Sequence, residues 1–197
     1  MEASPPSLRE RNRLRAREEI AEAALALFLR DGFTATPVER VAQEAGVSVR
    51  TVFRHFPAKE DLFFHDHERA VATFRSVLED AADDRPALDL LVEALLAMLQ
   101  LDMVRPDAAD VVGLLEREPA LQRYEERLSA DHHASAVAFL RGRLGDSPAA
   151  DQRAELLAGA FMGTMMSARR LVAAQPDRTP FEHLSAAVGL LRPVAWP

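Results

Sequence analysis

The chain has 197 residues, of which 48% are hydrophobic and 28% charged, and its formal net charge at pH 7 is −7. This length suffices for one large domain or two small ones with an apolar core. Cysteine is absent, which excludes disulfides, thiolate nucleophiles and cysteine-based metal sites. No apolar run approaches the roughly 18 residues that span a bilayer, and residues 1–7 lack a signal-peptide core. We therefore expect a soluble, cytoplasmic protein with no membrane partner.

The negative net charge argues at first against nucleic-acid binding, because phosphate contacts need a cationic surface. The charges are, however, unevenly distributed. Residues 1–59 contain ten Lys or Arg against eight Asp or Glu, whereas residues 60–197 contain 14 against 23. A slightly basic N-terminal region therefore precedes an acidic C-terminal region.

Apolar residues recur at intervals of three and four along the whole chain, which is the periodicity of amphipathic helices, and no alternating β-branched run indicates a strand. We predict an all-α protein with a disordered tail (residues 1–8), an N-terminal domain (9–60) and a larger C-terminal domain (61–197). Nine helices are expected, at about residues 9–30, 37–45, 49–55, 59–81, 87–103, 107–117, 119–144, 151–174 and 180–191.

The clearest local signals lie between residues 36 and 56. Residues 36–39 (Thr-Pro-Val-Glu) read as a capping box with proline at the first helical position. This helix is predicted to end at Gly46, and Ser48 is placed to cap a second one that runs to His55. Two short helices joined by a tight glycine turn form a helix-turn-helix.

The second of these helices separates apolar from basic residues. At about 100° per residue, Val52 and Phe56 share one face, and Arg50 and Arg54 point the opposite way. A DNA recognition helix needs such guanidinium groups free to reach bases, although a solvated helix with two surface arginines is the alternative. Alternating arginines between residues 9 and 17 could likewise form a phosphate clamp or a solvated helix start.

Three segments resemble the signature of the TetR family of transcriptional regulators: residues 32–42 (GFTATPVERVA), 45–48 (AGVS) and 51–62 (TVFRHFPAKEDL). The resemblance implies an all-helical homodimer that represses transcription from a near-palindromic DNA operator and binds a small-molecule effector. It implies base contacts from Val49, Arg50 and Thr51, and phosphate contacts from Thr36, Ser48, His55 and Lys59; Arg54 completes the expected DNA-binding set.

The chain departs from the family pattern at two of these positions. Phe53 stands where many members have tyrosine, so a hydroxyl contact to phosphate should be missing. Ala58 stands where many have serine, so the next helix should lack a cap worth about 1 kcal/mol.

The uncharged stretch 156–168 (LLAGAFMGTMMSA) is typical of a helix buried on all sides. A partner chain is the simpler source of that burial, and an intrachain core is the alternative. Because two glycines would allow close approach of another helix, the expected dimer interface comprises Leu157, Gly159, Gly163 and Ala168. The resemblance also implies that the last two helices pair as a four-helix dimer bundle.

An effector pocket is expected among the helices between residues 59 and 144. The candidate lining residues, each of which could equally be plain core, are Leu95, Met98, Leu99, Val112, Leu115, Phe161 and Met165. Segment 115–121 (LEREPAL) resembles a branch of the family with acyl-CoA-like effectors. Since one long helix from Lys59 would also line the pocket with Val71, Phe74 and Val77, we expect its tilt to couple effector to DNA.

Three other classes of protein are alternatives. His65 or His67 could bind a metal together with His132 or His133, which would make a metal-sensing regulator. An enzyme would need a recognisable motif such as HExxH, GxSxG or a Gly-rich phosphate loop, and the sequence contains none of them. We expect no enzymatic activity, no cofactor and no resident metal; a helical adaptor that does not bind DNA is the remaining alternative.

Overall fold

The computed structural model describes residues 7–80, 84–99, 107–175 and 177–197, apart from the side chains of Leu99, Ala173, Pro180 and Phe181. Ten helices and no strand occur within these ranges, which confirms the predicted all-α class. The chain divides into two compact units, Met1–Asp66 and His67–Pro197. None of the helices in the described ranges is long and apolar enough to cross a membrane.

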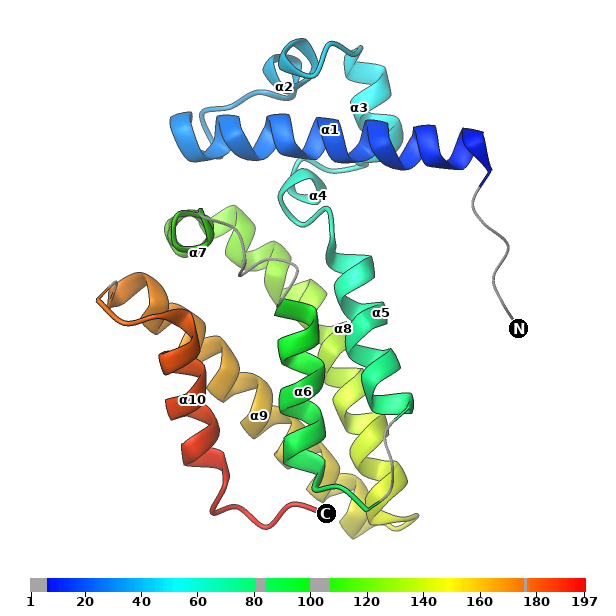
Figure 1. Ribbon diagram of the computed structural model, residues 1–197, viewed down its shortest axis with the longest axis vertical. Helices are drawn as coiled ribbons and strands as arrows, with labels where there is room; N and C mark the ends of the chain where they lie inside the picture. The colour runs from blue at the N-terminus through cyan, green and yellow to red at the C-terminus, as the bar shows by residue number, and fades with distance from the viewer. Residues whose placement is uncertain (1–6, 81–83, 100–106, 176) are drawn as a thin grey trace. The chain divides into compact units, whose positions relative to one another are not determined.

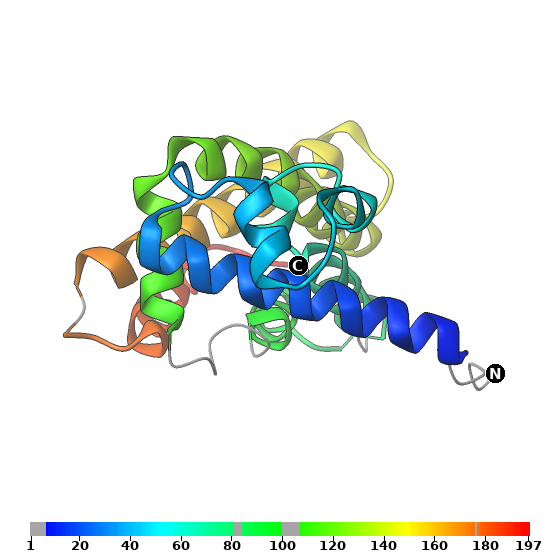
Figure 2. The same ribbon diagram turned by 90° about the horizontal axis from the view of Figure 1, so that it is seen from above.

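The N-terminal unit consists of α1 (Leu8–Asp31), α2 (Val38–Glu44), α3 (Val49–His55) and α4 (Glu60–Phe63). The long helix α1 packs against α2 and α4, and α2 packs against α3 (Figures 1 and 2). Fully buried side chains from every helix form the core of this unit; Phe28 of α1, Val41 of α2 and Val52 of α3 are each 0% exposed. Gly32, at φ 92°, ends α1 as predicted, because glycine adopts this left-handed region without strain.

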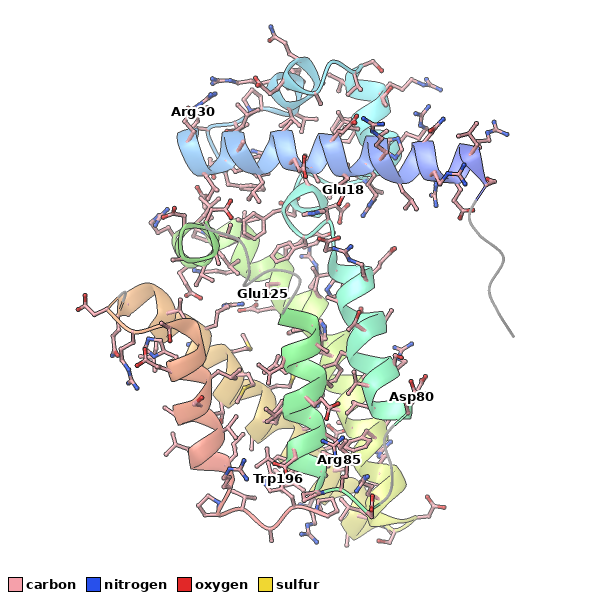
Figure 3. The ribbon with its side chains drawn as sticks, in the orientation of Figure 1. Glu18, Arg30, Asp80, Arg85, Glu125 and Trp196 are labelled. Carbon is pink, nitrogen blue, oxygen red and sulfur yellow. The ribbon has the colours of Figure 1, made fainter. Side chains whose placement is uncertain are left out.

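The C-terminal unit is a bundle of six helices: α5 (His67–Glu79), α6 (Ala87–Leu99), α7 (Ala108–Arg117), α8 (Pro119–Leu144), α9 (Pro148–Ala174) and α10 (Pro180–Leu191). Helix α9 contacts α7, α8 and α10, and α5 contacts α6 and α8 (Figure 1). One end of this bundle, where Figure 3 shows Arg85 and Trp196, is tied locally: the Arg143 guanidinium donates to the Arg85 carbonyl (2.6 Å), and Trp196 Nε1 donates to the Leu191 carbonyl (2.9 Å).

One predicted helix is two. The expected helix over residues 59–81 is interrupted after Phe63, so α4 and α5 are separate and belong to different units. The carbonyl of His65, which a continuous helix would offer to the backbone, instead accepts a hydrogen bond from Arg17 Nη2 (3.1 Å). The local sequence around His65 cannot show this hydrogen bond, because its donor lies 48 residues earlier in the chain.

Other boundaries shift slightly. Helix α1 includes Leu8, and α9 begins at Pro148, because Ser147 caps it and proline occupies its first turn. The expected end of the helix over residues 87–103 lies outside the described residues, since α6 is described only to Leu99.

Candidate nucleic-acid interface

The helix-turn-helix forms where the sequence predicts it. Helix α2 ends at Glu44, and Gly46 takes φ 65°, a left-handed conformation that glycine adopts without penalty. The Val47 N–H donates to the Ala42 carbonyl (2.9 Å), which closes the turn, and Ser48 follows as the N-cap of α3. These local bonds fix the start of α3 relative to α2.

The predicted capping box at residues 36–39 is wrong. The N-cap of α2 is Pro37, with no side-chain cap, and the helix begins at Val38. Thr36 is 0% exposed, and its hydroxyl donates to the Gly32 carbonyl (2.8 Å). Thr36 therefore ties the end of α1 to the start of α2.

Helix α3 has the two faces expected of it. Val52 and Phe56 are 0% exposed, whereas Arg50 and Arg54 lie in solvent. Within the described part of the chain, no carboxylate forms an ion pair with either arginine. Both guanidinium groups are therefore available to an external acceptor.

Phe53 shares this exposed face. It is 47% exposed, one of few large apolar side chains in the described residues to be so. Sequence reasoning considered Phe53 only for the hydroxyl that it lacks. The same helical wheel that brings Arg50 and Arg54 outward places Phe53 beside Arg50, on the side away from Arg54, and phenylalanine can contact a thymine methyl group in the major groove.

Ser48 and Thr51 form a hydroxyl pair at the start of α3. Ser48 Oγ accepts from the Thr51 backbone N–H (3.1 Å), and the two hydroxyl oxygens lie 2.9 Å apart. Ser48 is exposed, and Val49 and Thr51 are partly exposed. The bond confirms Ser48 as a helix cap and holds Thr51 on the side of α3 that faces solvent.

Lys59 is turned toward the N-terminal unit itself. Its ammonium donates to the Phe33 carbonyl and lies 4.3 Å from the Phe33 ring centroid and 5.6 Å from that of Phe28. The missing serine at Ala58 is partly compensated, because Asp61 Oδ2 accepts from the Ala58 N–H (2.8 Å). A carboxylate three residues on thus replaces half of the expected cap.

Arg17 holds the ends of two helices, a role that sequence reasoning missed. Its Nη1 donates to the carbonyl of His55, the last residue of α3, at 2.6 Å, and its guanidinium carbon lies 4.4 Å from the Phe56 ring centroid. With the second bond to His65, one side chain of α1 links the exits of α3 and α4. Helical periodicity could not predict these contacts, because the bonded residues are 38 and 48 positions apart.

His55 lies in a basic environment at the end of α3. Burial lowers its pKa below the usual value, and the nearby positive charges of Arg54, Arg17 and Arg13 lower it further. The neutral imidazole is favoured in the free protein, and an anion placed beside it would favour the charged form.

The predicted pocket residues lie mostly in the core of the C-terminal unit. Leu95, Phe161 and Met165 belong to its main buried cluster, with Met98 packed against it. Leu115 is 5% exposed, Val112 is partly exposed, and the side chain of Leu99 lies outside the described residues. Of the α5 residues expected beside them, Phe74 is buried and Val71 and Val77 are partly exposed.

The predicted interface residues fall on two faces of α9. Leu157 and Ala168 are 7% and 6% exposed and belong to the chain's own core cluster. Gly159 and Gly163 lie on the opposite, exposed face, where an added Cβ would meet nothing within 4 Å. Leu156 (67% exposed) and Leu171 (42%) lie on this same face. The single chain covers only one side of α9, so burial of this helix on all sides by a partner chain stays a prediction.

The histidines considered as metal ligands form separate pairs. The rings of His67 and His132 stack edge-on at 5.3 Å, and His133 Nε2 lies 3.0 Å from Glu155 Oε2. His65 Nε2 instead contacts Asp66 Oδ2 at 3.1 Å. Among the described residues, no group of three or more His, Asp or Glu side chains is arranged to hold a metal ion.

Comparison with known proteins agrees with this architecture. Residues 20–65, which span the helix-turn-helix, match the family model described as bacterial regulatory proteins of the tetR family. The HTH-type transcriptional regulator TcmR of Streptomyces glaucescens is 28% identical over 195 residues, covering 92% of this chain and 83% of TcmR.

Solved structures match over nearly the full length. NalD, the secondary repressor of the MexAB-OprM multidrug efflux pump in Pseudomonas aeruginosa, is 19% identical, with a TM-score of 0.64 over 93% of this chain and 95% of NalD. FadR of Thermus thermophilus, a transcriptional repressor solved with lauroyl-CoA, is 22% identical, with a TM-score of 0.55 over 89% and 93%. Residues 20–65 therefore carry a DNA-binding segment of the tetR family, and the chain is similar over most of its length to a curated transcriptional regulator and shares its two-domain fold with a solved repressor.

Proposed function

We propose that the protein is a dimeric repressor that reads a near-palindromic operator with α3 and releases it when an apolar or amphipathic small molecule binds the C-terminal unit. The observation that carries the proposal is the exposed face of α3, where Arg50 and Arg54 have no ion-pair partner among the described residues. We assign DNA binding to the N-terminal unit, and effector binding and dimerisation to the C-terminal unit.

On this proposal Arg50, Phe53 and Thr51 face the bases of the major groove, since arginine forks recognise guanine and apolar groups meet thymine methyls. Ser48, Val49 and His55 lie nearby, with phosphates within reach of the exposed Ser48 hydroxyl. Thr36 and Lys59 would need to rearrange before they could touch a phosphate, because both donate to carbonyls of their own unit.

The operator can be tested directly. Selection of duplexes from a random library should return a near-palindrome with half-sites about one helical turn, or a multiple, apart. Arg50→Ala should weaken binding to that duplex by roughly 1 to 3 kcal/mol and relax the preference at one base pair per half-site. A uniform loss over all single-base operator variants, measured by fluorescence anisotropy, would remove Arg50 from base recognition.

Dimerisation is supported by the uncovered face of α9. Small residues at positions 159 and 163 and exposed Leu156 and Leu171 form an apolar strip that a second copy could cover. Leu190 of α10 is also 76% exposed. Light scattering should give twice 21.8 kDa, and Gly163→Leu should shift the protein toward monomer.

A matched control makes this test specific. Gly142 of α8 likewise has open space around its would-be Cβ, so Gly142→Leu carries the same change in helix propensity without touching the strip. Dissociation by Gly163→Leu alone is the expected outcome. A dimer that survives Gly163→Leu would place the interface elsewhere.

Effector response follows from linkage. Because α4 and α5 are separate helices, we propose that coupling uses the segment that joins them, residues 64–66, where Arg17 holds the His65 carbonyl, rather than the tilt of one continuous helix. Tenfold release of DNA needs only about 1.4 kcal/mol of differential binding. FadR shares the fold and was solved with lauroyl-CoA, so an acyl-CoA is the first probe.

Calorimetric titration with lauroyl-CoA, and with fatty-acyl and aromatic ligands, should be run with and without the selected duplex. An effector must bind more weakly to the DNA complex by the same factor by which it weakens DNA binding. Equal affinities in both titrations would show that the ligand does not regulate DNA binding.

A further inference from the structure

The arginines in the first half of α1 do not share one environment. Arg15 Nε pairs with Glu19 (2.9 Å) on the exposed side of the helix. Arg17 is turned inward to the carbonyls of His55 and His65. Arg9 and Arg13 are exposed and line a groove that Arg17 also borders, and an alternating pattern could not show these differences.

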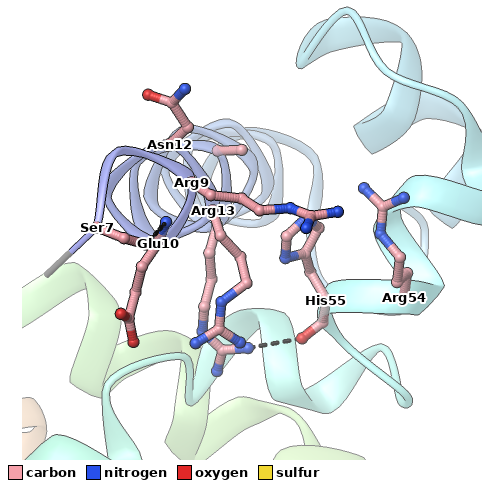
Figure 4. Close-up of a pocket in the computed structure, with 9 residues that line it drawn as sticks. Ser7, Arg9, Glu10, Asn12, Arg13, Arg54 and His55 are labelled. Carbon is pink, nitrogen blue, oxygen red and sulfur yellow. Dashed lines mark hydrogen bonds between the residues drawn. The ribbon is translucent and has the colours of Figure 1, made fainter.

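The groove lies between the N-terminal half of α1 and the C-terminal end of α3 (Figure 4). Its lining includes four arginines (Arg9, Arg13, Arg17 and Arg54), His55 and one carboxylate, Glu10. In Figure 4, Arg9 reaches from α1 toward the side from which Arg54 extends, while Glu10 points away from both. An excess of positive charge therefore surrounds an open hollow.

The field of these arginines acts on their neighbour. Arg54, Arg17 and Arg13 each lower the pKa of His55, in addition to its burial. Like charges that converge on one space repel each other, and an anion in that space would relieve the repulsion. The groove is thus built for negative charge.

Arg54 connects the groove to the recognition helix. It lines the groove and also belongs to the exposed face of α3. Arg9 and Arg13 lie four residues apart, about 6 Å along the same face of α1. Figures 1 and 2 show α1 running past α3 toward its N-terminus, so these side chains continue outward from the base-reading element.

We propose that this groove holds the DNA backbone that flanks the base pairs read by α3, with phosphates bound by Arg9 and Arg13. The inference rests on the proposed base recognition by α3, since Arg54 is shared. An open groove lined by exposed arginines suits a continuous strand of phosphates, and it lengthens the operator beyond the bases that α3 can touch.

The test uses two double variants that remove the same charge from the same helix. Arg9→Ala with Arg13→Ala removes the groove residues, and Arg11→Ala with Arg15→Ala removes arginines that do not line it. Thermal melting monitored by circular dichroism checks that both fold. The probes are a library-selected duplex trimmed to the bases that it specifies, the same duplex with about five flanking base pairs at each end, and a fixed random-sequence duplex.

The groove variant should lower the slope of log K against log salt by roughly two per protomer on the long duplex, since each phosphate contact contributes about 0.9. The control variant should change the slope by less than one. Wild-type protein should prefer the long duplex to the trimmed one by several-fold, and the groove variant should lose that preference.

Equal slopes for the two double variants, or equal wild-type affinity for long and trimmed duplexes, would overturn the inference. These results leave base recognition intact, because Arg50→Ala would still relax the base preference. If selection returns no preferred sequence, the proposed function fails, and the slopes on the random duplex still decide whether the groove binds phosphates.

Discussion

The N-terminal unit leaves the arginines of α3 in water, and the C-terminal unit buries one arginine among carboxylates. Arg50 and Arg54 of α3 are exposed, without ion-pair partners in the described part of the chain. Arg169 of α9 has a side chain only 25% exposed; its Nη2 lies 3.0 Å from Glu116 Oε1, and its Nη1 pairs with Glu125. Burial lowers the pKa of Arg169, and the hydrogen bond to Glu116 opposes that shift. The exposed guanidinium groups of α3 can bind an external anion, whereas the Arg169 guanidinium joins α9 to α7 and α8.

The largest effect should come from breaking the buried cluster. Arg169→Met keeps the length of the side chain but leaves two partly buried carboxylates, Glu116 and Glu125, without their cation. Removing one partner of a buried pair costs about 3 kcal/mol. Urea denaturation of the full chain should show this loss, whereas Arg170→Met, at an exposed neighbouring position, should change stability little. Equal midpoints for the two variants would mean that Arg169 is a solvated surface residue.

The next effect is a pH dependence of the C-terminal unit. Burial and, to a lesser degree, the nearby His67 together lower the pKa of His132 from 6.5 to about 4, against an opposing effect of Asp131. Its Nε2 is buried without a hydrogen-bond partner in the described structure. The unfolded chain therefore binds more protons between pH 6.5 and 4, and stability falls as pH falls through this window, by up to about 3 kcal/mol.

His132→Phe keeps a ring against His67 and Phe74, whose centroids lie 5.3 and 5.6 Å away, and removes the titration. The stability difference between variant and wild type should therefore grow as pH falls from 6.5 to 4. His133→Gln, which removes the exposed pair with Glu155, is the control. A constant difference over this range would show that His132 does not titrate with folding.

The two units also differ in how well local structure could be predicted from their sequences. Two motifs of the same pattern, Thr-Pro-X-Glu, show why. Residues 179–182 (Thr-Pro-Phe-Glu) form a complete capping box, in which the Thr179 N–H donates to Glu182 and the Glu182 N–H donates to Thr179. Residues 36–39 (Thr-Pro-Val-Glu) do not, because α2 begins one residue later, with Pro37 as its N-cap, and the Thr36 side chain is turned back to donate to the Gly32 carbonyl. The same pattern of residue types therefore predicts a capping box correctly only where the threonine side chain is turned toward the start of the helix that follows it.

In the candidate site, what could be predicted depends on how far apart in the sequence the contacting residues lie. The outward arginines of α3, the turn at Gly46 and the cap at Ser48 depend on partners within five residues, and each was predictable. The role of Arg17 and the internal contacts of Lys59 depend on residues 26 to 48 positions away and were not. An uncharged stretch likewise could not say which half of α9 its own chain would cover.

A smaller effect is expected at Lys59. This side chain contacts its own unit, as Arg169 does, and is also a candidate to bind a phosphate, as the exposed arginines are. Lys59→Met removes the bond to the Phe33 carbonyl and the cation–π contacts with Phe28 and Phe33, so the N-terminal unit should lose about 1 to 2 kcal/mol. If Lys59 also reaches phosphate in the complex, the salt slope should fall by about one. An unchanged slope with reduced stability would give Lys59 a purely internal role.

The smallest effect compares two matched helix caps. Ser48 accepts from the Thr51 N–H at 3.1 Å at the start of α3, and Ser147 accepts from the Ala150 N–H at 3.1 Å at the start of α9. Replacing either serine with alanine should cost about 1 kcal/mol of stability. Only Ser48→Ala should also weaken operator binding, because α3 has seven residues and Ser48 Oγ holds the Thr51 hydroxyl.

Aspartate separates the two roles of Ser48, because it caps helices as well as serine does but carries a negative charge. Ser147→Asp should therefore restore stability and leave DNA binding as in wild type. Ser48→Asp should restore stability equally, yet bind operator more weakly than Ser48→Ala, since a carboxylate at this exposed position would repel a nearby phosphate. Thermal melting and anisotropy on the same samples separate the two quantities. Recovery of operator affinity in Ser48→Asp would mean that no phosphate approaches the start of α3, and the cap alone would then account for the loss in Ser48→Ala.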